Sequence, residues 1–186
     1  MQLINVHSIF SKFPVLALGK VNLRQLTKDD TKDFYSYISQ DGVKKYLSDQ
    51  ETPRDLISAE VELMYWAGLF RQMRSIYWGI VTKDTNRLIG TCGYNNWSRI
   101  HNRVELSYDL NCNYWGRGIM TEAVSAITRF AFEELQASRI QATVVFDNIS
   151  SMRVLEKAGY LCEGKLRNYN VLHNKTVDAL MYAIAK

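Results

Sequence analysis

Hydrophobic and polar residues alternate along several short segments of this chain, and in other segments the apolar residues recur every third or fourth position. Strict alternation is typical of a half-buried β-strand, whereas the wider spacing is typical of an amphipathic helix. Strand character is found in seven segments: 21–26, 76–82, 87–94, 103–110, 139–146, 160–169 and 176–185. Helix character is found in four longer segments and one short one: 29–39, 52–70, 119–135, 149–158 and, as a turn or short helix, 41–47. The pattern predicts a single mixed α/β domain in the order β-α-α-β-β-β-α-β-α-β-β, with the last two strands as an antiparallel pair.

Residues with strong positional preferences support the expected helix ends. Thr27, followed by Asp29 and Asp30, supplies an N-cap and early acidic residues for the first helix. Pro53 suits the first turn of the long helix, where its missing N–H is not needed. Gly159 suits the left-handed position that ends a helix. The long helix carries its apolar positions at Leu56, Ile57, Val61, Met64, Tyr65, Leu69 and Phe70.

A glycine-bearing turn lies between the expected strand 103–110 and the expected helix 119–135. Gly116 and Gly118 have no Cβ, so the backbone can turn tightly and approach a ligand closely. The N–H groups of the first helical turn have no partner within the helix, and the positive end of the helix dipole favours an anion there. Arg117 adds a positive charge. A phosphate-binding turn and a simple tight turn remain equally open, because the spacing matches neither the dinucleotide nor the nucleoside triphosphate fingerprint.

Length, composition and charge narrow the class of protein. The chain has 186 residues, of which 47% are hydrophobic and 23% charged, as in an ordinary globular domain. Its net charge of +4 suits an anionic cofactor but is too small to indicate a nucleic-acid partner. We expect no membrane span, because no apolar stretch is long enough. Lys12 and Pro14 interrupt the only apolar patch near the start, so we also expect no signal peptide.

The cysteines and histidines do not indicate a metal site. Cys92, Cys112 and Cys162 are odd in number and lack the spacing of metal ligands, which favours reduced thiols and a cytoplasmic location. The histidines are also scattered along the chain: His7, His101 and His173. We therefore expect no bound metal, and surface or loop positions for the histidines.

The glycine turn is similar to motif A of the GCN5-related N-acetyltransferases (GNAT), whose pattern is Arg/Gln-x-x-Gly-x-Gly/Ala. Asn113 stands where Arg or Gln is usual, and this matters little if backbone N–H groups bind the ligand. Four blocks together carry the resemblance, which runs from about Lys20 to the end: 21–30, 105–110, 114–123, and 147–160 with Glu163-Gly164. Within the family the chain most resembles the RimJ/RimL group, which acetylates the N-termini of ribosomal proteins, and its relatives that act on small amines.

This resemblance implies a fold and an activity. The fold is a GNAT domain over 20–186, preceded by an N-terminal extension over 1–19. Its mixed, twisted sheet has about seven strands and about four helices, and it splays open between the fourth and fifth strands. The activity is direct transfer of an acetyl group from acetyl-coenzyme A (acetyl-CoA) to a primary amine in a ternary complex. The acceptor is a protein α-amine or a small-molecule amine, and we expect a monomer or homodimer.

The resemblance also implies a set of cofactor-binding residues. The backbone of the glycine turn and first helical turn would bind the diphosphate, through Gly116, Arg117, Gly118, Ile119, Met120 and Thr121. Backbone groups at the strand end, over Leu110, Asn111 and Cys112, would pair with the pantetheine arm. Asn148 would contact the same arm. From the residues alone, Asn148 is equally well explained as a helix N-cap, and Cys112 as a small core residue.

Acetyl transfer to an amine needs a proton acceptor for the ammonium and stabilisation of the charge that develops on the thioester. The resemblance assigns Glu105 as the general base, directly or through water. The strand pattern alone would instead place Glu105 in solvent or beside Arg103. Some relatives carry a tyrosine general acid after a leucine, but here Glu156 follows Leu155. Ser151 or a water molecule would then protonate the departing thiolate, or the thiolate leaves unassisted.

The acceptor site is less well specified. The candidate walls are four aromatic residues, each of which also fits the core: Tyr46, Trp66, Trp97 and Tyr108. Tyr169 and the loop before Thr176 would close the far side. Two other functions remain open at this point. One is a non-catalytic module that binds acyl-CoA, and the other is a transferase that uses a different acyl donor.

Overall fold

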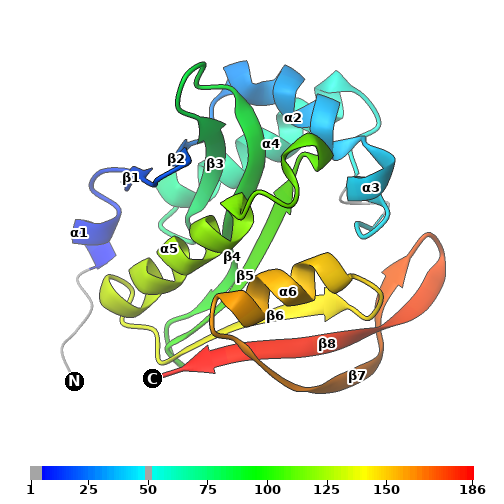
Figure 1. Ribbon diagram of the computed structural model, residues 1–186. Helices are drawn as coiled ribbons and strands as arrows, with labels where there is room; N and C mark the ends of the chain where they lie inside the picture. Colours follow the sequence, from blue (N-terminus) through cyan, green and yellow to red (C-terminus); the bar gives the residue numbers. More distant parts are fainter. Residues whose placement is uncertain (1–5, 49–51) are drawn as a thin grey trace.

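The computed structural model describes residues 6–48 and 52–186. In this part of the chain one sheet of eight strands has the order β1-β2-β3-β4-β5-β6-β8-β7 (Figure 1). Its strands are β1 (Leu16–Ala17), β2 (Val21–Gln25), β3 (Tyr77–Thr82), β4 (Leu88–Ser98), β5 (Arg103–Leu110), β6 (Arg139–Val145), β7 (Leu161–Leu172) and β8 (Lys175–Ala185). All seven expected strands are present, and β1 is an eighth. Two residues are too few to show an alternating pattern, so β1 was not predicted.

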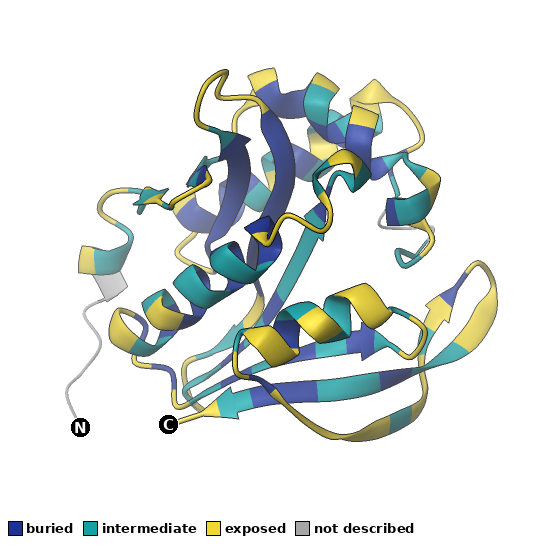
Figure 2. Ribbon diagram, in the orientation of Figure 1, coloured by how far each residue is buried: buried dark blue, intermediate teal, exposed yellow. Residues whose placement is uncertain are grey.

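The helices lie on both faces of this sheet. They are α1 (Val6–Ile9), η1 (Lys28–Asp30), α2 (Thr31–Ile38), α3 (Asp41–Lys44), α4 (Leu56–Arg71), η2 (Cys112–Tyr114), α5 (Ile119–Glu133) and α6 (Ile149–Lys157). One cluster of buried residues joins α2 and α4 to the sheet, and another joins α5 and α6 to it. Figure 2 shows that β3 and β4 are buried along most of their length, whereas β7 at the sheet edge is largely exposed.

The sheet divides between β5 and β6, which are the fourth and fifth of the expected strands. These two strands pair in parallel over only three positions, the last of which is Glu105 with Gln141. Beyond that point β5 remains paired with β4, and β6 with β8. A register shift between Tyr94 and Asn96 on β4 lies directly opposite Glu105. An extra residue of this kind bends a strand and increases its twist, which accounts for the divergence of the two halves here.

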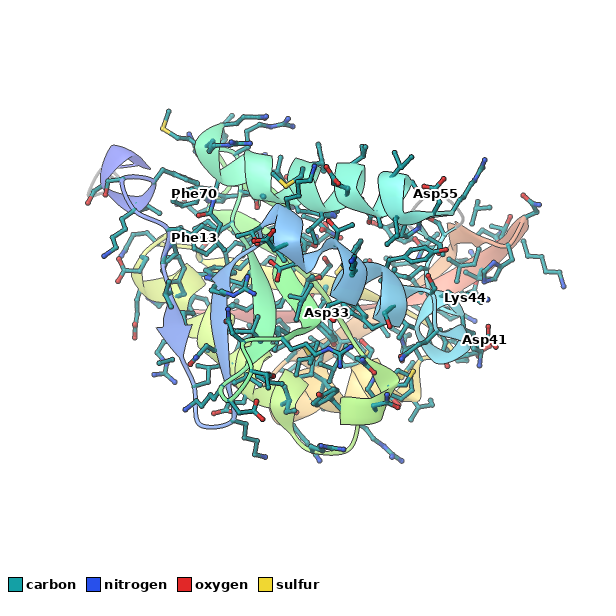
Figure 3. All side chains as sticks on the ribbon, turned by 90° about the horizontal axis from the view of Figure 1, so that it is seen from above. Phe13, Asp33, Asp41, Lys44, Asp55 and Phe70 are labelled. Atoms are coloured by element: carbon teal, nitrogen blue, oxygen red, sulfur yellow. The ribbon has the colours of Figure 1, made fainter. Side chains whose placement is uncertain are left out.

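The described part of the expected N-terminal extension packs on the domain. The ring of Phe13 lies 4.9 Å from that of Phe70 (Figure 3), and the ring of Phe10 lies 5.0 Å from it. The indole Nε1 of Trp78 donates to the carbonyl oxygen of Pro14 over 2.7 Å. Residues 8–19 therefore complete the sheet and its aromatic core, whereas residues 1–5 of the expected extension lie outside the described part.

Helix α4 differs from its prediction at its start and on its buried face. It begins at Leu56 rather than near Pro53, because the Asp55 carboxylate accepts the Ser58 N–H over 2.7 Å and caps it there (Figure 3). Four of the expected apolar positions are exposed: Leu56 at 44%, Ile57 at 76%, Val61 at 66% and Tyr65 at 54%. Leu69 and Phe70 are buried as expected, and Ala59, Leu63 and Ala67, which were not predicted, are buried as well. This helix is apolar on several sides, so periodicity alone could not choose the face, and small residues allow a closer approach to the sheet.

Candidate functional site

A cavity of about 680 Å³ opens between the diverging halves of the sheet. Residues 105–110 of β5 line one wall and residues 142–145 of β6 line the other. The first residues of α5 and α6 also reach it, together with the segment 42–48 and the end of β7. The cavity therefore lies where the expected motifs converge.

The wall formed by β5 is an open strand edge. Between Leu106 and Leu110 this strand has β4 on one side and, within residues 6–48 and 52–186, no strand on the other. Backbone groups on such an edge are free to pair with an extended ligand. Two groups at its end are already engaged, because the Leu110 carbonyl accepts from Trp115 Nε1 over 2.8 Å and the Cys112 N–H donates to Gln40 Oε1 over 2.9 Å. An extended arm would therefore pair with β5 before Cys112.

The glycine turn, which lines the cavity, has the backbone geometry expected of an anion seat. Gly116 and Gly118 have φ angles of +73° and +75°, which side-chain-bearing residues rarely adopt. A Cβ on Gly116 would meet no atom of the described residues within 4 Å. Gly118 is the N-cap of α5 and has no side chain to occupy the first N–H groups of the helix.

These unoccupied donors and the dipole of the 15-residue helix fit the diphosphate of coenzyme A. Ile119, Met120 and Thr121, which follow the turn, also line the cavity. When bound, acetyl-CoA supplies an activated acetyl group as a thioester. The chain supplies the seat, the open strand edge and the groups beside them.

Two of the expected cofactor residues direct their side chains elsewhere. The guanidinium of Arg117 lies 5.2 Å from the ring centroid of Tyr114, and its Nη2 donates to the carbonyl of Asn113 over 2.8 Å. The Cys112 Sγ points to α3, so close to Gly42 that a Cβ there would lie 2.7 Å from it. Burial raises the pKa of the Cys112 thiol, so this thiol is a poor nucleophile. Neither Arg117 nor Cys112 is among the residues that line the cavity.

Glu105 occupies the fork of the sheet. It is the last β5 residue that pairs with β6, and it lines the cavity. Among the described residues no ion pair joins it to Arg103. Ser107 and Asp109 follow at intervals of two on the same face of β5 and also line the cavity. One side of the cavity therefore carries a row of polar side chains that starts with a carboxylate at the fork.

Asp109 was not assigned a role from the sequence. Its carboxylate accepts from the Tyr37 hydroxyl over 2.6 Å, from Thr91 Oγ1 over 2.7 Å and from the Thr91 N–H over 3.0 Å. Burial raises the pKa of Asp109, and these three hydrogen bonds oppose that shift. The arrangement ties α2 to the strands beneath the cavity. No local pattern could have revealed it, because Tyr37 and Asp109 are 72 residues apart.

The start of α6 brings two predicted residues together. Asn148 Oδ1 accepts the Ser151 N–H over 3.1 Å, so Asn148 is an N-cap as well as a cavity residue. The Ser151 hydroxyl oxygen lies 2.8 Å from the Tyr108 hydroxyl. Across the cavity, the Tyr46 hydroxyl donates to the carbonyl of Asp147 over 3.3 Å.

The aromatic candidates for the acceptor wall divide into two groups. Tyr46, Tyr108 and Tyr169 line the cavity. Trp66 instead stacks on Tyr77 with ring centroids 4.2 Å apart, and Trp97 packs beside Phe10 at the N-terminal segment. His101 and His173 lie in turns outside the cavity lining, and the His7 side chain lies outside the described part.

Comparisons with known proteins show which sequences this chain is similar to. The sequence model of the acetyltransferase (GNAT) domain matches residues 20–161. The uncharacterized N-acetyltransferase YoaA of Bacillus subtilis (strain 168) is 35% identical over 176 residues, which cover 94% of this chain and 98% of that protein. The [ribosomal protein uS5]-alanine N-acetyltransferase of Escherichia coli (strain K12) is 25% identical over 115 residues, 61% of this chain and 59% of that protein.

Solved structures share the fold. The ribosomal-protein-S5-alanine acetyltransferase of Vibrio fischeri superposes with a TM-score of 0.82 at 20% identity, covering 92% of this chain and 96% of that one. RimL, a ribosomal L7/L12 α-N-protein acetyltransferase solved in complex with coenzyme A, gives a TM-score of 0.84 at 16% identity, covering 92% and 98%. Within residues 6–48 and 52–186, no helix is both long and apolar enough to cross a membrane.

Proposed function

This chain belongs to the GNAT family of acetyl-CoA-dependent acetyltransferases, and we propose that it acetylates a primary amine by direct transfer in a ternary complex. The acceptor is the α-amine of a protein N-terminus or the amine of a small molecule. The observation that carries the proposal is the position of Glu105. It stands at the fork of the sheet and lines the same cavity as the anion seat at α5 and the hydroxyl of Ser151.

Glu105 and Ser151 have different tasks in this reaction. Glu105 takes a proton from the acceptor ammonium and thereby frees the nitrogen lone pair that attacks the acetyl carbon, and the second nitrogen proton passes to solvent as the amide forms. As the carbon–sulfur bond breaks, its electron pair goes to sulfur, and the Ser151 hydroxyl donates a hydrogen bond to that charge. No residue of the chain needs to carry the acetyl group, because an amine held beside the thioester can attack it directly. The position of the Cys112 thiol, turned toward α3, supports this route.

The test compares the parent protein with Glu105→Gln and Glu105→Ala on a panel of peptides and amines. Because the names of two relatives refer to an alanine of a ribosomal protein, peptides with an N-terminal alanine are the first probes. Mass spectrometry identifies the acetylated nitrogen, and a thiol reagent measures the release of coenzyme A. We expect kcat to fall roughly 10²-fold or more at neutral pH, with little change in KM for acetyl-CoA, because Glu105 is remote from the anion seat.

Glu134→Gln is the matched control, because Glu134 is an exposed carboxylate at the end of α5 and does not line the cavity. Glu134→Gln should leave kcat and the KM for acetyl-CoA unchanged. If the Glu105 variants acetylate within a few-fold of the parent, the assignment of Glu105 as the base is wrong. If the parent binds acetyl-CoA without acetylating any amine in the panel, the proposed acceptor class is wrong.

A further inference from the structure

One hydrogen bond crosses the cavity floor between the two halves of the divided sheet. The Tyr108 hydroxyl comes from β5, and Ser151 belongs to α6, which follows β6. The Tyr108 hydroxyl lies 2.8 Å from Ser151 Oγ and 3.1 Å from the Ser151 carbonyl oxygen. Both residues line the cavity.

Counting protons shows what this contact does to Ser151. Tyr108 has one hydroxyl proton, and among the described residues the acceptors within its reach are both on Ser151. Burial raises the pKa of Tyr108, so it remains a neutral donor at any ordinary pH. When Tyr108 donates its proton to the closer oxygen, Ser151 Oγ, the hydroxyl proton of Ser151 cannot also lie between the two oxygens. The Ser151 hydroxyl can then donate that proton to a group in the cavity.

On the basis of the proposed function, we propose that Tyr108 is a positioning residue that donates to Ser151 Oγ and so directs the Ser151 proton toward the sulfur of the departing thiol. Ser151 touches the sulfur, and Tyr108 acts through Ser151. The hydrogen bond stabilises the negative charge on sulfur as the carbon–sulfur bond breaks. No covalent change at either residue is required, since the thiolate can take its proton from solvent.

The backbone around Ser151 supports this role. The Asn148 cap holds the Ser151 N–H at 3.1 Å, so the first turn of α6 is fixed before Tyr108 orients the hydroxyl. A residue with several hydrogen bonds to its own surroundings loses little freedom when it later contacts a ligand. The Ser151 hydroxyl is therefore pre-oriented from two sides, by Asn148 through the backbone and by Tyr108 through the side chain.

A double-mutant cycle on kcat is the first test. Ser151→Ala and Tyr108→Phe should each lower kcat, the second by about tenfold, which is the value of one directed hydrogen bond. The double variant should be no slower than Ser151→Ala alone, because Tyr108 acts only through Ser151. KM for acetyl-CoA should stay the same. If the two losses multiply in the double variant, Tyr108 does not act through Ser151.

Tyr160→Phe is the matched control. The Tyr160 hydroxyl makes a similar bond, 2.7 Å from Thr128 Oγ1, but both residues are buried and neither lines the cavity. This variant should lose stability and keep the parent kcat. Tyr108→Met, which also lacks the hydroxyl, replaces Tyr108→Phe if the latter does not fold. A loss of kcat in Tyr160→Phe as large as in the Tyr108 variant would overturn the inference.

The second test does not depend on turnover. Coenzyme A is bound to each variant, and its thiol is titrated by the ultraviolet absorbance of the thiolate. The charged residues that line the cavity in the described part of the chain are the same in every variant: Glu105, Asp109, Arg153 and Lys157. A difference in the thiol pKa between variants therefore reports the effect of the Tyr108 and Ser151 hydroxyls. We expect Tyr108→Phe and Ser151→Ala to raise the pKa of the bound thiol by a similar amount, about one unit.

The two tests separate failure of this inference from failure of the proposed function. If the parent acetylates amines but Tyr108→Phe leaves both kcat and the thiol pKa unchanged, only the inference fails. If the parent acetylates nothing yet binds coenzyme A, the proposed function fails. The thiol titration then still decides whether Tyr108 directs Ser151: a raised pKa in both variants supports it, and an unchanged pKa in Tyr108→Phe overturns it.

Discussion

The two helices that begin at the cavity, α5 and α6, start in opposite ways. Gly118 caps α5 in a left-handed conformation and offers no side chain, so the first N–H groups stay available. Asn148 caps α6, and its side chain accepts the Ser151 N–H. The start of α5 can therefore bind an anion through its backbone, whereas the start of α6 is satisfied internally and acts through side chains. A third helix, α4, starts outside the cavity lining, and there the charged side chain of the N-cap residue Asp55 accepts a backbone N–H of the first turn.

The largest expected effect comes from placing a charge in the seat of α5. Gly116→Asp puts a carboxylate into space that is open for at least 4 Å, and aspartate tolerates the positive φ of this position better than most residues. Repulsion of the diphosphate and loss of charge-assisted hydrogen bonds should raise Kd and KM for acetyl-CoA roughly 10²-fold. Calorimetry with coenzyme A measures Kd directly.

Gly116→Asn is its control, because asparagine has the same shape and the same tolerance of positive φ without the charge. It should weaken binding much less than Gly116→Asp. If both variants bind coenzyme A as tightly as the parent, the diphosphate does not bind at this turn. The start of α5 would then have no role in binding the cofactor.

A smaller effect is expected from removing the cap of α6. Asn148→Ala should lower the free energy of unfolding by about 1 kcal/mol. It should also lower kcat, because Ser151 lies on the turn that is released. Asp55→Ala removes the cap of α4 and should lower stability without changing kcat. Denaturant unfolding and steady-state kinetics on both variants provide the comparison. An unchanged kcat in Asn148→Ala would mean that the cap does not hold Ser151 for the reaction.

The smallest effect is the pH dependence of the α4 cap. Hydrogen bonds from the Ser58 backbone and side chain lower the pKa of Asp55 below 3.8, its ordinary value. An acid whose pKa is lower in the folded state stabilises that state above the unfolded pKa. This contribution is lost as the pH falls through the folded pKa. The stability difference between the parent and Asp55→Asn should therefore narrow below about pH 4, as thermal unfolding across pH would show. A difference that stays constant down to pH 2 would contradict this account of the cap.

Segments governed by local rules were predicted well. The strand, glycine turn and helix around Gly116 and Gly118 follow from backbone preferences within about a dozen residues, and both glycines adopt positive φ. Gly159 ends α6 with a φ of +91° for the same reason. The face of α4 was not predictable in this way. Ile57 and Val61 are as hydrophobic as the buried Leu63, and only the shape of the sheet selects among them.

The order of strands and helices, the glycine seat and the resemblance to acetyltransferases were contained in the sequence by itself, because each depends on residues that are neighbours along the chain. Tertiary structure alone decided where β5 leaves β6, which cavity Glu105 enters, and that Tyr108 meets Ser151. Tyr108 and Ser151 are 43 positions apart in the sequence, and Tyr37 and Asp109, which are also hydrogen-bonded, are 72 positions apart. Contacts over such separations depend on strand register, twist and packing of the whole sheet, which no local pattern encodes.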